Sequence, residues 1–187
     1  MDNDYFKQIR KSLIVPERIY FWTATIHEWQ QLLKEEDYKK VILESLKYLV
    51  EKGKIEIFAF VIMPNHVHFI WRINEQNGKE TTVGSFLKYT AHEFKKLLSV
   101  EGKRRLEEYA VEATNKSFEF WRRDSLAIEL ISSEVAYQKL EYIHNNPCTK
   151  HWQLVVQPFD YKYATARFYE EGVGEFDFVK DLRDEFD

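Results

Sequence analysis

The sequence predicts a mixed α+β domain of the ferredoxin-like plan, in which an antiparallel sheet carries helices on one face. Segments rich in β-branched and aromatic residues alternate with segments of helical periodicity, in the order β-α-β-β-α-β-β-α. Two of the strand segments are separated only by a short turn, as in an antiparallel hairpin. A chain of 187 residues with 44% apolar residues is long enough for one sizeable core and short for two.

The first half of the chain contains a strand, a helix and the hairpin. Ile19–Ile26 is rich in β-branched and aromatic residues, which is typical of a strand. Residues 29–51 have apolar residues at helical spacing and are followed by a glycine, which predicts a helix. Ile55–Ile62 and Val67–Ile73 are the two hairpin strands, joined through Pro64-Asn65, a turn dipeptide.

The second half begins with a long amphipathic helix. Thr81 or Thr82 can cap it, and its apolar residues recur every three or four positions up to Leu98. Pro147 stops the last helix of the chain. That last helix is expected from residue 134 to about residue 145. Two short strands are expected before it, at 117–122 and 126–131.

Charge and composition divide the chain into one domain, residues 1–169, and an acidic C-terminal extension, residues 170–187, which we expect to be partly disordered. The extension carries a charge of -6, so the domain carries +2 although the whole chain is at -4. Residues 85–105 hold a local surplus of +4, a modest electropositive surface. From charge alone, a solvated helix face explains this surplus somewhat better than a nucleic-acid site.

The sequence predicts a cytoplasmic protein without a membrane partner. No stretch approaches the roughly 18 uncharged apolar residues of a membrane span. The acidic N-terminus lacks the basic-then-apolar layout of a secretory signal. The single cysteine, Cys148, cannot form an intramolecular disulfide, which fits a reducing compartment.

Two histidines on the strand that leaves the turn are the first candidate site residues. His66 and His68 are two positions apart, and strand side chains alternate between faces, so both imidazoles project from the same side. Two imidazoles on one rigid face form half of a metal site. Since imidazoles are rare in a helix-covered core, we expect both near the exposed side of the sheet or at its edge.

The last helix offers groups that complete such a site. Tyr142 and Asn146 are four residues apart, so they share one helical face. Asn146 Oδ1 can act as a third, neutral metal ligand, and Tyr142 can attack a phosphodiester bound to the metal. Tyr89 is the main rival as nucleophile, and Asn145 is the alternative ligand if the helix is slightly rotated.

Six blocks of sequence follow one another in an order that is more specific than a His-x-His pair alone. They are YFWTAT (20–25), FAFVIMPNHVH (58–68), SFLK (85–88), FWRRD (120–124), YIHNNP (142–147) and YKYATARFY (161–169). In these blocks the chain resembles the HUH single-tyrosine transposases, and among them the REP-associated tyrosine transposases. The resemblance covers nearly the whole chain, from about Tyr20 to Tyr169.

The resemblance implies the HUH nuclease fold and a metal-dependent endonuclease and strand transferase (transposase) that acts on single-stranded DNA at hairpins or imperfect palindromes. In this family a tyrosine cleaves the strand, stays attached to the 5′ phosphate and frees a 3′ hydroxyl. Carried over by position, Tyr142 is the nucleophile, and His66, His68 and Asn146 are the metal ligands. The implied metal is Mg²⁺ or Mn²⁺, and two imidazoles favour Mn²⁺. Relatives occur as monomers and as dimers, so a homodimer stays open.

Other residues are candidate DNA contacts. Lys88, Arg122 and Arg123 can bind phosphates. The aromatic segment 118–121 can stack bases, although core packing is the more common use for at least two of these rings. The tryptophans at 22, 29 and 152 are expected in the core or at its rim.

Two features depart from the family pattern. Residues 125–127 read Ser-Leu-Ala where relatives commonly have an aromatic residue or histidine, and the chain is not markedly basic. Both features bear on DNA affinity and target preference rather than on the four candidate active-site residues. The alternatives are a catalytically silent DNA-hairpin-binding protein on the same fold, and a nuclease directed to RNA.

Overall fold

The computed structural model describes residues 14–76, 78–113, 116–123, 125–172 and 174–186, so the acidic N-terminus lies outside the described residues. Its centre is a four-stranded antiparallel sheet in the order β2-β3-β1-β6. The four strands are β1 (Ile19–Thr25), β2 (Ile55–Ile62), β3 (His66–Ile73) and β6 (Leu126–Glu129). With a helix between β1 and β2 and another between β3 and β6, this is the ferredoxin-like order, and the predicted fold class is confirmed.

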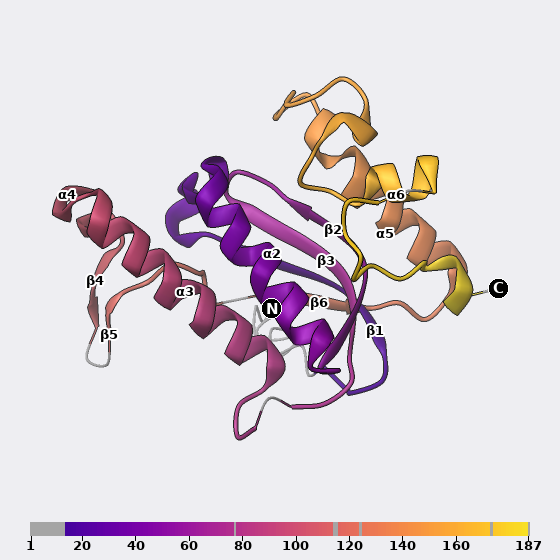
Figure 1. Ribbon diagram of the computed structural model, residues 1–187, viewed down its shortest axis with the longest axis horizontal. Helices are drawn as coiled ribbons and strands as arrows, with labels where there is room; N and C mark the ends of the chain where they lie inside the picture. Colours follow the sequence, from indigo (N-terminus) through magenta and orange to yellow (C-terminus); the bar gives the residue numbers. More distant parts are fainter. Residues whose placement is uncertain (1–13, 77, 114–115, 124, 173, 187) are drawn as a thin grey trace, which may run out of the picture.

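Helices α2 (Glu36–Glu51) and α3 (Thr82–Glu101) cover one face of the sheet (Figure 1). The Thr81 side chain caps α3 by accepting a hydrogen bond from the Gly84 N–H, as the sequence predicts. The core beneath these helices is aromatic and almost without exposed surface: Trp22, Phe69, Trp71, Phe86 and Phe94. No helix in the described part of the chain has both the length and the apolar character needed to cross a membrane.

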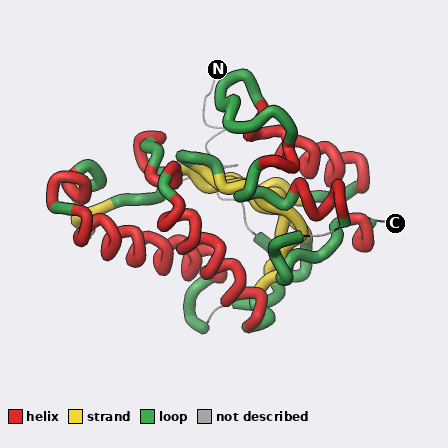
Figure 2. Tube along the Cα trace, turned by 45° about the horizontal axis from the view of Figure 1, so that its top comes forward, coloured by secondary structure: helices red, strands yellow, loops and turns green. Residues whose placement is uncertain are grey.

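The opposite face of the sheet is also covered, and this differs from the expectation of helices on one face only. Helix α5 (Ser133–Asn145) packs on that face through Ala136 and Ile143, against apolar residues of β1, β2 and β3. In Figure 2 helices lie on both sides of the sheet. The same packing brings the last helix to the strand that carries the histidines.

Helix α3 extends beyond the sheet and carries a small arm at its far end (Figure 1). The arm consists of α4 (Lys103–Glu107) and the two-stranded sheet of β4 (Ala110–Ala113) and β5 (Lys116–Phe118). The predicted strand at 117–122 is therefore wrong as an element of the main sheet. Its second half returns to the core, where Phe120 and Trp121 are buried and Trp121 bridges to Ile26.

The helix expected over 29–51 begins only at Glu36. Two short 3₁₀ turns precede it, η1 (His27–Trp29) and η2 (Leu32–Lys34). Glu28 and Trp29 have φ values of 52° and 60°, which are left-handed and cannot continue a right-handed helix. Apolar spacing alone did not reveal this break.

The acidic C-terminal segment packs on the domain, so the expectation of disorder is wrong for the residues that the structure describes. After η4 (Pro158–Asp160) and α6 (Ala166–Glu171), the chain runs beside β2, where Val179 forms a parallel bridge to Ile57. Leu182 is fully buried before the final turn η5 (Arg183–Glu185). The segment thereby covers part of β2, the edge strand of the sheet.

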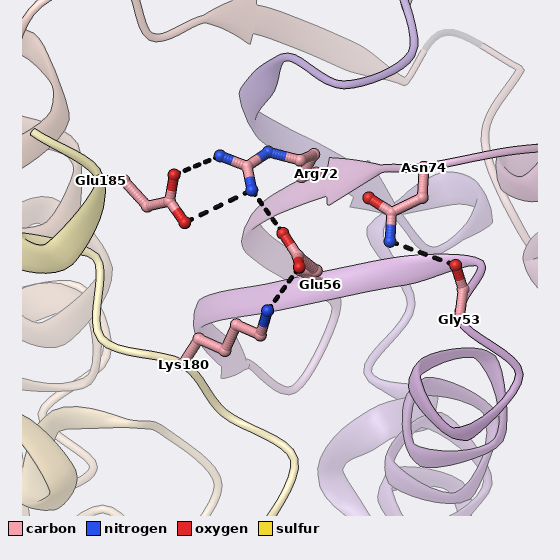
Figure 3. A network of polar contacts seen from close by, with 6 residues as sticks. All are labelled: Gly53, Glu56, Arg72, Asn74, Lys180 and Glu185. Carbon is pink, nitrogen blue, oxygen red and sulfur yellow. Dashed lines mark hydrogen bonds and ion pairs between the residues drawn. The ribbon is translucent and has the colours of Figure 1, made fainter.

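A polar network connects this segment to the edge strand β2 and its neighbour β3 (Figure 3). Arg72 of β3 pairs with Glu56 of β2 at 2.5 Å and with Glu185 near the C-terminus. Lys180 pairs with the same Glu56 carboxylate. Four charges from three segments thus alternate in sign, and the part of the acidic segment nearest the sheet is locally neutralised.

Candidate active site

Both candidate histidines lie at the start of β3 and point to the face that α5 covers. The register pairs His66 with Thr25 and His68 with Thr23 of β1, and the two imidazole centroids are 4.6 Å apart. The expectation that they avoid the core under α2 and α3 is confirmed. The expectation of an exposed or edge position is wrong, because β3 is an inner strand and the two residues are only 8% and 5% exposed.

A hydrogen bond fixes each imidazole at Nδ1. Asn65 Oδ1 lies 2.6 Å from His66 Nδ1, and Thr23 Oγ1 lies 2.7 Å from His68 Nδ1. Because an amide oxygen only accepts, His66 Nδ1–H donates, and its Nε2 keeps a free lone pair. His68 Nε2 is buried and has no hydrogen-bond partner among the described residues. Histidines held at one nitrogen with the other nitrogen free are typical of metal ligands.

Burial keeps both imidazoles neutral at ordinary pH. The pKa of His66 is lowered to about 4, first by burial and then by the nearby charge of His151. The pKa of His68 is lowered to about 3, first by burial and then by the charges of His66 and Lys139. Neutral imidazole is the form that binds metal, so no proton has to be displaced from the site near pH 7.

Tyr142 of α5 lies against this pair. Its ring centroid is 5.2 Å from that of His68, and Phe21 stacks on His68 while meeting the Tyr142 ring edge-on. Tyr142 is still 49% exposed, so a phenol at the surface is fixed beside a buried imidazole. Lys139, one turn earlier, brings its ammonium to 5.1 Å from the Phe21 ring and 5.9 Å from the Tyr142 ring.

The other predicted residues of this helix occupy its end. Asn146 caps α5 and is 5% exposed, and the following loop brings the Trp152 ring to 5.9 Å from His66. Asn145, the alternative ligand, is exposed and donates from its side chain to the Glu141 carbonyl. Tyr89, the rival nucleophile, is on α3 and therefore on the other side of the sheet.

The three expected DNA contacts are not gathered at the site. Lys88 is on α3, under the opposite face, and pairs with Glu80 at 2.6 Å. Arg123 pairs with Glu119 at 3.2 Å. Arg122 lies near the end of β1, where its N–H donates to the Thr25 carbonyl.

Sequence reasoning missed the residues that orient the histidines. Thr23 is polar within a largely apolar strand, which is a detectable signal, but only the register of β1 on β3 shows that it meets His68. Asn65 looked like a turn residue because Pro64 precedes it. Lys139 and Phe21 carry no local signal, because their role depends on how α5 crosses the sheet.

A family model for IS200-like transposases matches residues 19–146, from the first strand of the sheet to the residue that caps α5. The chain belongs to the IS200-like transposase family. The matched segment includes both histidines, Tyr142 and Asn146.

One solved transposase structure shows the same fold as this IS200-like transposase. A REP-associated tyrosine transposase bound to a REP hairpin aligns over 92% of this chain and 91% of its own, with a TM-score of 0.59 and 20% sequence identity. A crystal structure of a protein assigned as a transposase of Deinococcus radiodurans R1 aligns over 71% of this chain and 93% of its own, with a TM-score of 0.46 and 16% identity. No curated protein matches the chain.

Proposed function

We propose that this transposase is a metal-dependent endonuclease and strand transferase for single-stranded DNA that works through a covalent 5′-phosphotyrosine. The observation that carries the proposal is the Tyr142 phenol beside His68, whose buried Nε2 has no partner in the part of the chain that the structure describes. An exposed nucleophile next to an oriented, unsatisfied metal ligand is the pairing that metal-assisted phosphoryl transfer requires.

The donor set fits a divalent metal. His66 and His68 would bind it through Nε2, with Asn146 as the third protein ligand. The described residues hold no group of three or more His, Cys, Asp or Glu side chains that could bind a metal, so a third ligand of another type, such as a carboxamide, is needed. When bound, Mg²⁺ or Mn²⁺ neutralises charge that develops on the phosphate, and the imidazoles favour Mn²⁺.

The protein's own residues supply the covalent step. The Tyr142 oxygen forms a bond to phosphorus as the bond between phosphorus and the 3′ oxygen breaks, and the phenolic proton is transferred, in net terms, to that leaving oxygen. The products are a 5′-phosphotyrosine and a free 3′ hydroxyl. Lys139 can hold a non-bridging phosphate oxygen beside Tyr142, and Thr23 and Asn65 keep the imidazoles oriented.

We propose single-stranded or hairpin DNA as the partner. The similar solved transposase is bound to a REP hairpin, which supports hairpin DNA as the substrate class. Arg122 is the best placed of the three expected phosphate contacts, because it is anchored to Thr25 in the strand position opposite His66. Lys88 and Arg123 would first have to leave their ion pairs.

Trapping the covalent adduct tests the proposal. We incubate three proteins with Mn²⁺ and a pool of hairpin oligonucleotides that have randomised single-stranded flanks: the wild type, Tyr142→Phe and Tyr89→Phe. Denaturing gel electrophoresis then separates free protein from the covalent protein–DNA adduct. Tyr89 is the matched control because it is equally exposed, at 48%, but lies on the other side of the sheet.

We expect wild type and Tyr89→Phe to form an adduct that EDTA prevents, and Tyr142→Phe to form none. An adduct that persists in Tyr142→Phe would refute the nucleophile. Hairpin binding by wild-type protein without any adduct would favour the silent DNA-binding alternative.

A further inference from the structure

Trp29 is the most exposed of the tryptophans. Its side chain is 56% exposed, whereas Trp22, Trp71 and Trp121 are buried. The Arg122 guanidinium lies over the indole, with Cζ 5.0 Å from the ring centroid. An exposed indole with a cation against it is a surface feature that the sequence did not predict.

The backbone holds this indole in place at the cost of local strain. Glu28 and Trp29 are consecutive non-glycine residues in the left-handed region, which L side chains rarely adopt. Three hydrogen bonds fix the turn: Trp29 N–H to Ile26 O at 3.0 Å, Gln30 N–H to His27 O at 3.1 Å, and Asn65 Nδ2–H to Trp29 O at 3.3 Å. Strained residues that are fixed in this way cluster at ligand sites.

The same turn is tied directly to the candidate active site. Asn65 donates to the Trp29 carbonyl through Nδ2 and accepts from His66 through Oδ1. One carboxamide therefore connects the exposed indole to a proposed metal ligand. From the other side, the Arg122 N–H donates to the Thr25 carbonyl, in the residue that pairs with His66 across the strands.

Arg122 also differs from the other expected DNA contacts in its charge environment. Lys88 and Arg123 are neutralised by Glu80 and Glu119. Within the described ranges of the chain, no carboxylate pairs with Arg122. Its charge therefore remains available to a phosphate beside the indole.

We propose that Trp29 and Arg122 form a stacking platform for one unpaired nucleobase of the DNA strand, next to the phosphate that Tyr142 attacks; this rests on the proposed function. An exposed aromatic ring with a guanidinium is the combination that binds single-stranded DNA without sequence preference. The residue that lies over the indole, Arg122, is a cation, which fits a phosphate-bearing nucleotide better than an apolar protein partner.

Binding and crosslinking of a single strand test the platform. The probe is a thymidine homopolymer of about twenty nucleotides with one photoreactive 5-iodouracil, since stacking tolerates any base. All variants carry Tyr142→Phe to prevent cleavage, and the platform variants are Trp29→Ala, Trp29→Phe and Arg122→Gln. Tyr48→Ala is the matched control, because Tyr48 is 54% exposed with Lys52 5.7 Å over its ring but lies on α2, under the opposite face.

We expect Trp29→Ala to weaken binding by roughly 5- to 150-fold, the range of one stacked base. Trp29→Phe should retain most of the affinity, Tyr48→Ala should match the parent protein, and the crosslink should map to Trp29 by mass spectrometry. Arg122→Gln should weaken binding and reduce its salt dependence. Thermal unfolding of each variant identifies any loss of DNA affinity that is due to misfolding. Trp29→Phe keeps an aromatic ring at this position, so it distinguishes an effect of the missing ring from an effect of misfolding.

Normal binding by Trp29→Ala, or a crosslink elsewhere, would overturn the platform and leave the proposed chemistry standing. If the platform variants lose DNA affinity as expected but the wild-type protein forms no covalent adduct, the platform is supported and the proposed chemistry is overturned. Failure of the parent protein to bind the homopolymer would also overturn the platform, and the adduct assay with hairpin oligonucleotides would then decide the chemistry independently.

Discussion

The two faces of strand β3 carry different kinds of side chain and have different roles. Val67, Phe69 and Trp71 point toward α2 and α3, have no exposed surface and pack among other aromatic rings. His66 and His68 point toward α5 and form polar contacts with β1 and the turn, and the Nε2 atom of His68 is buried with no partner within the described ranges. One strand of eight residues thus holds the domain together with one face and positions chemical groups with the other.

The difference between the two faces explains how the strand keeps the histidines in a fixed position. The aromatic face prevents β3 from shifting, because a slip of one residue would exchange the two sets of side chains between the faces. The histidine face therefore needs only two side-chain hydrogen bonds to define its imidazoles. Function on one face depends on packing on the other, and mutations can separate the two contributions.

Removing the histidines should have the largest effect on function. We expect the double variant His66→Ala and His68→Ala to lower adduct formation by at least about 1,000-fold, because transition-state charge loses its metal. Hairpin affinity, measured without metal by fluorescence anisotropy, should stay within about threefold. His92→Ala on exposed α3 is the control. If hairpin binding is lost as well, the histidines read DNA or hold the fold.

Truncating a side chain on the aromatic face of β3 should lower stability and leave most of the activity. Phe69→Ala removes a fully buried ring that contacts Trp22, Trp71 and Phe86, and we expect it to lower the free energy of unfolding by about 3–5 kcal/mol. Urea titration measures this loss. Val100→Ala, at 89% exposed, should change stability by less than about 0.5 kcal/mol.

At temperatures where Phe69→Ala is still folded, it should retain most of its adduct formation. A specific loss of adduct in the folded variant would show that the two faces are not separable, and that the aromatic core directly sets the geometry of the histidines.

The sequence was most informative about features that depend on the spacing of neighbouring residues. The His-x-His pair, the strand that carries it and the helix that ends at Asn146 are local patterns, and the ferredoxin-like order follows from the succession of elements. The expectation that at least two rings of the segment 118–121 pack in the core is confirmed, because Phe120 and Trp121 are buried. The expectation that Trp29 lies in the core or at its rim does not anticipate its exposure of 56%. Exposure in these loops depends on backbone angles and long-range pairing, which spacing does not encode.

The buried imidazoles should make stability depend on pH. Their pKa values of about 4 and 3 lie below the value of about 6.5 expected in the unfolded chain. Between the folded-state pKa values and about pH 6.5, the histidines of the unfolded chain take up protons that those of the folded chain do not. The free energy of unfolding therefore falls as pH falls below about 6.5. Above that pH both states are neutral and the contribution vanishes. Each histidine adds a slope of up to about 1.4 kcal/mol per pH unit.

This slope can be measured by urea unfolding of metal-free protein at a series of pH values. A double variant with His66→Asn and His68→Asn should lose much of it between about pH 6.5 and pH 4, whereas His92→Ala should keep it. An unchanged slope in the double variant would mean that the imidazoles are protonated in the folded protein, contrary to their burial.

Thr23→Val should give the smallest effect, because it removes only the hydroxyl that meets His68 Nδ1 and keeps the β-branched shape. Loss of such a supporting hydrogen bond lowers metal affinity or activity by about 10- to 100-fold. Thr25→Val is the matched control, since Thr25 lies two positions along the same strand, opposite His66, whose Nδ1 is already held by Asn65. The measurements are the Mn²⁺ concentration for half-maximal adduct formation and the unfolding temperature. Equal effects of the two valines would mean that the hydroxyl of Thr23 has no part in orienting the imidazole, and that packing from Phe21 alone fixes its plane.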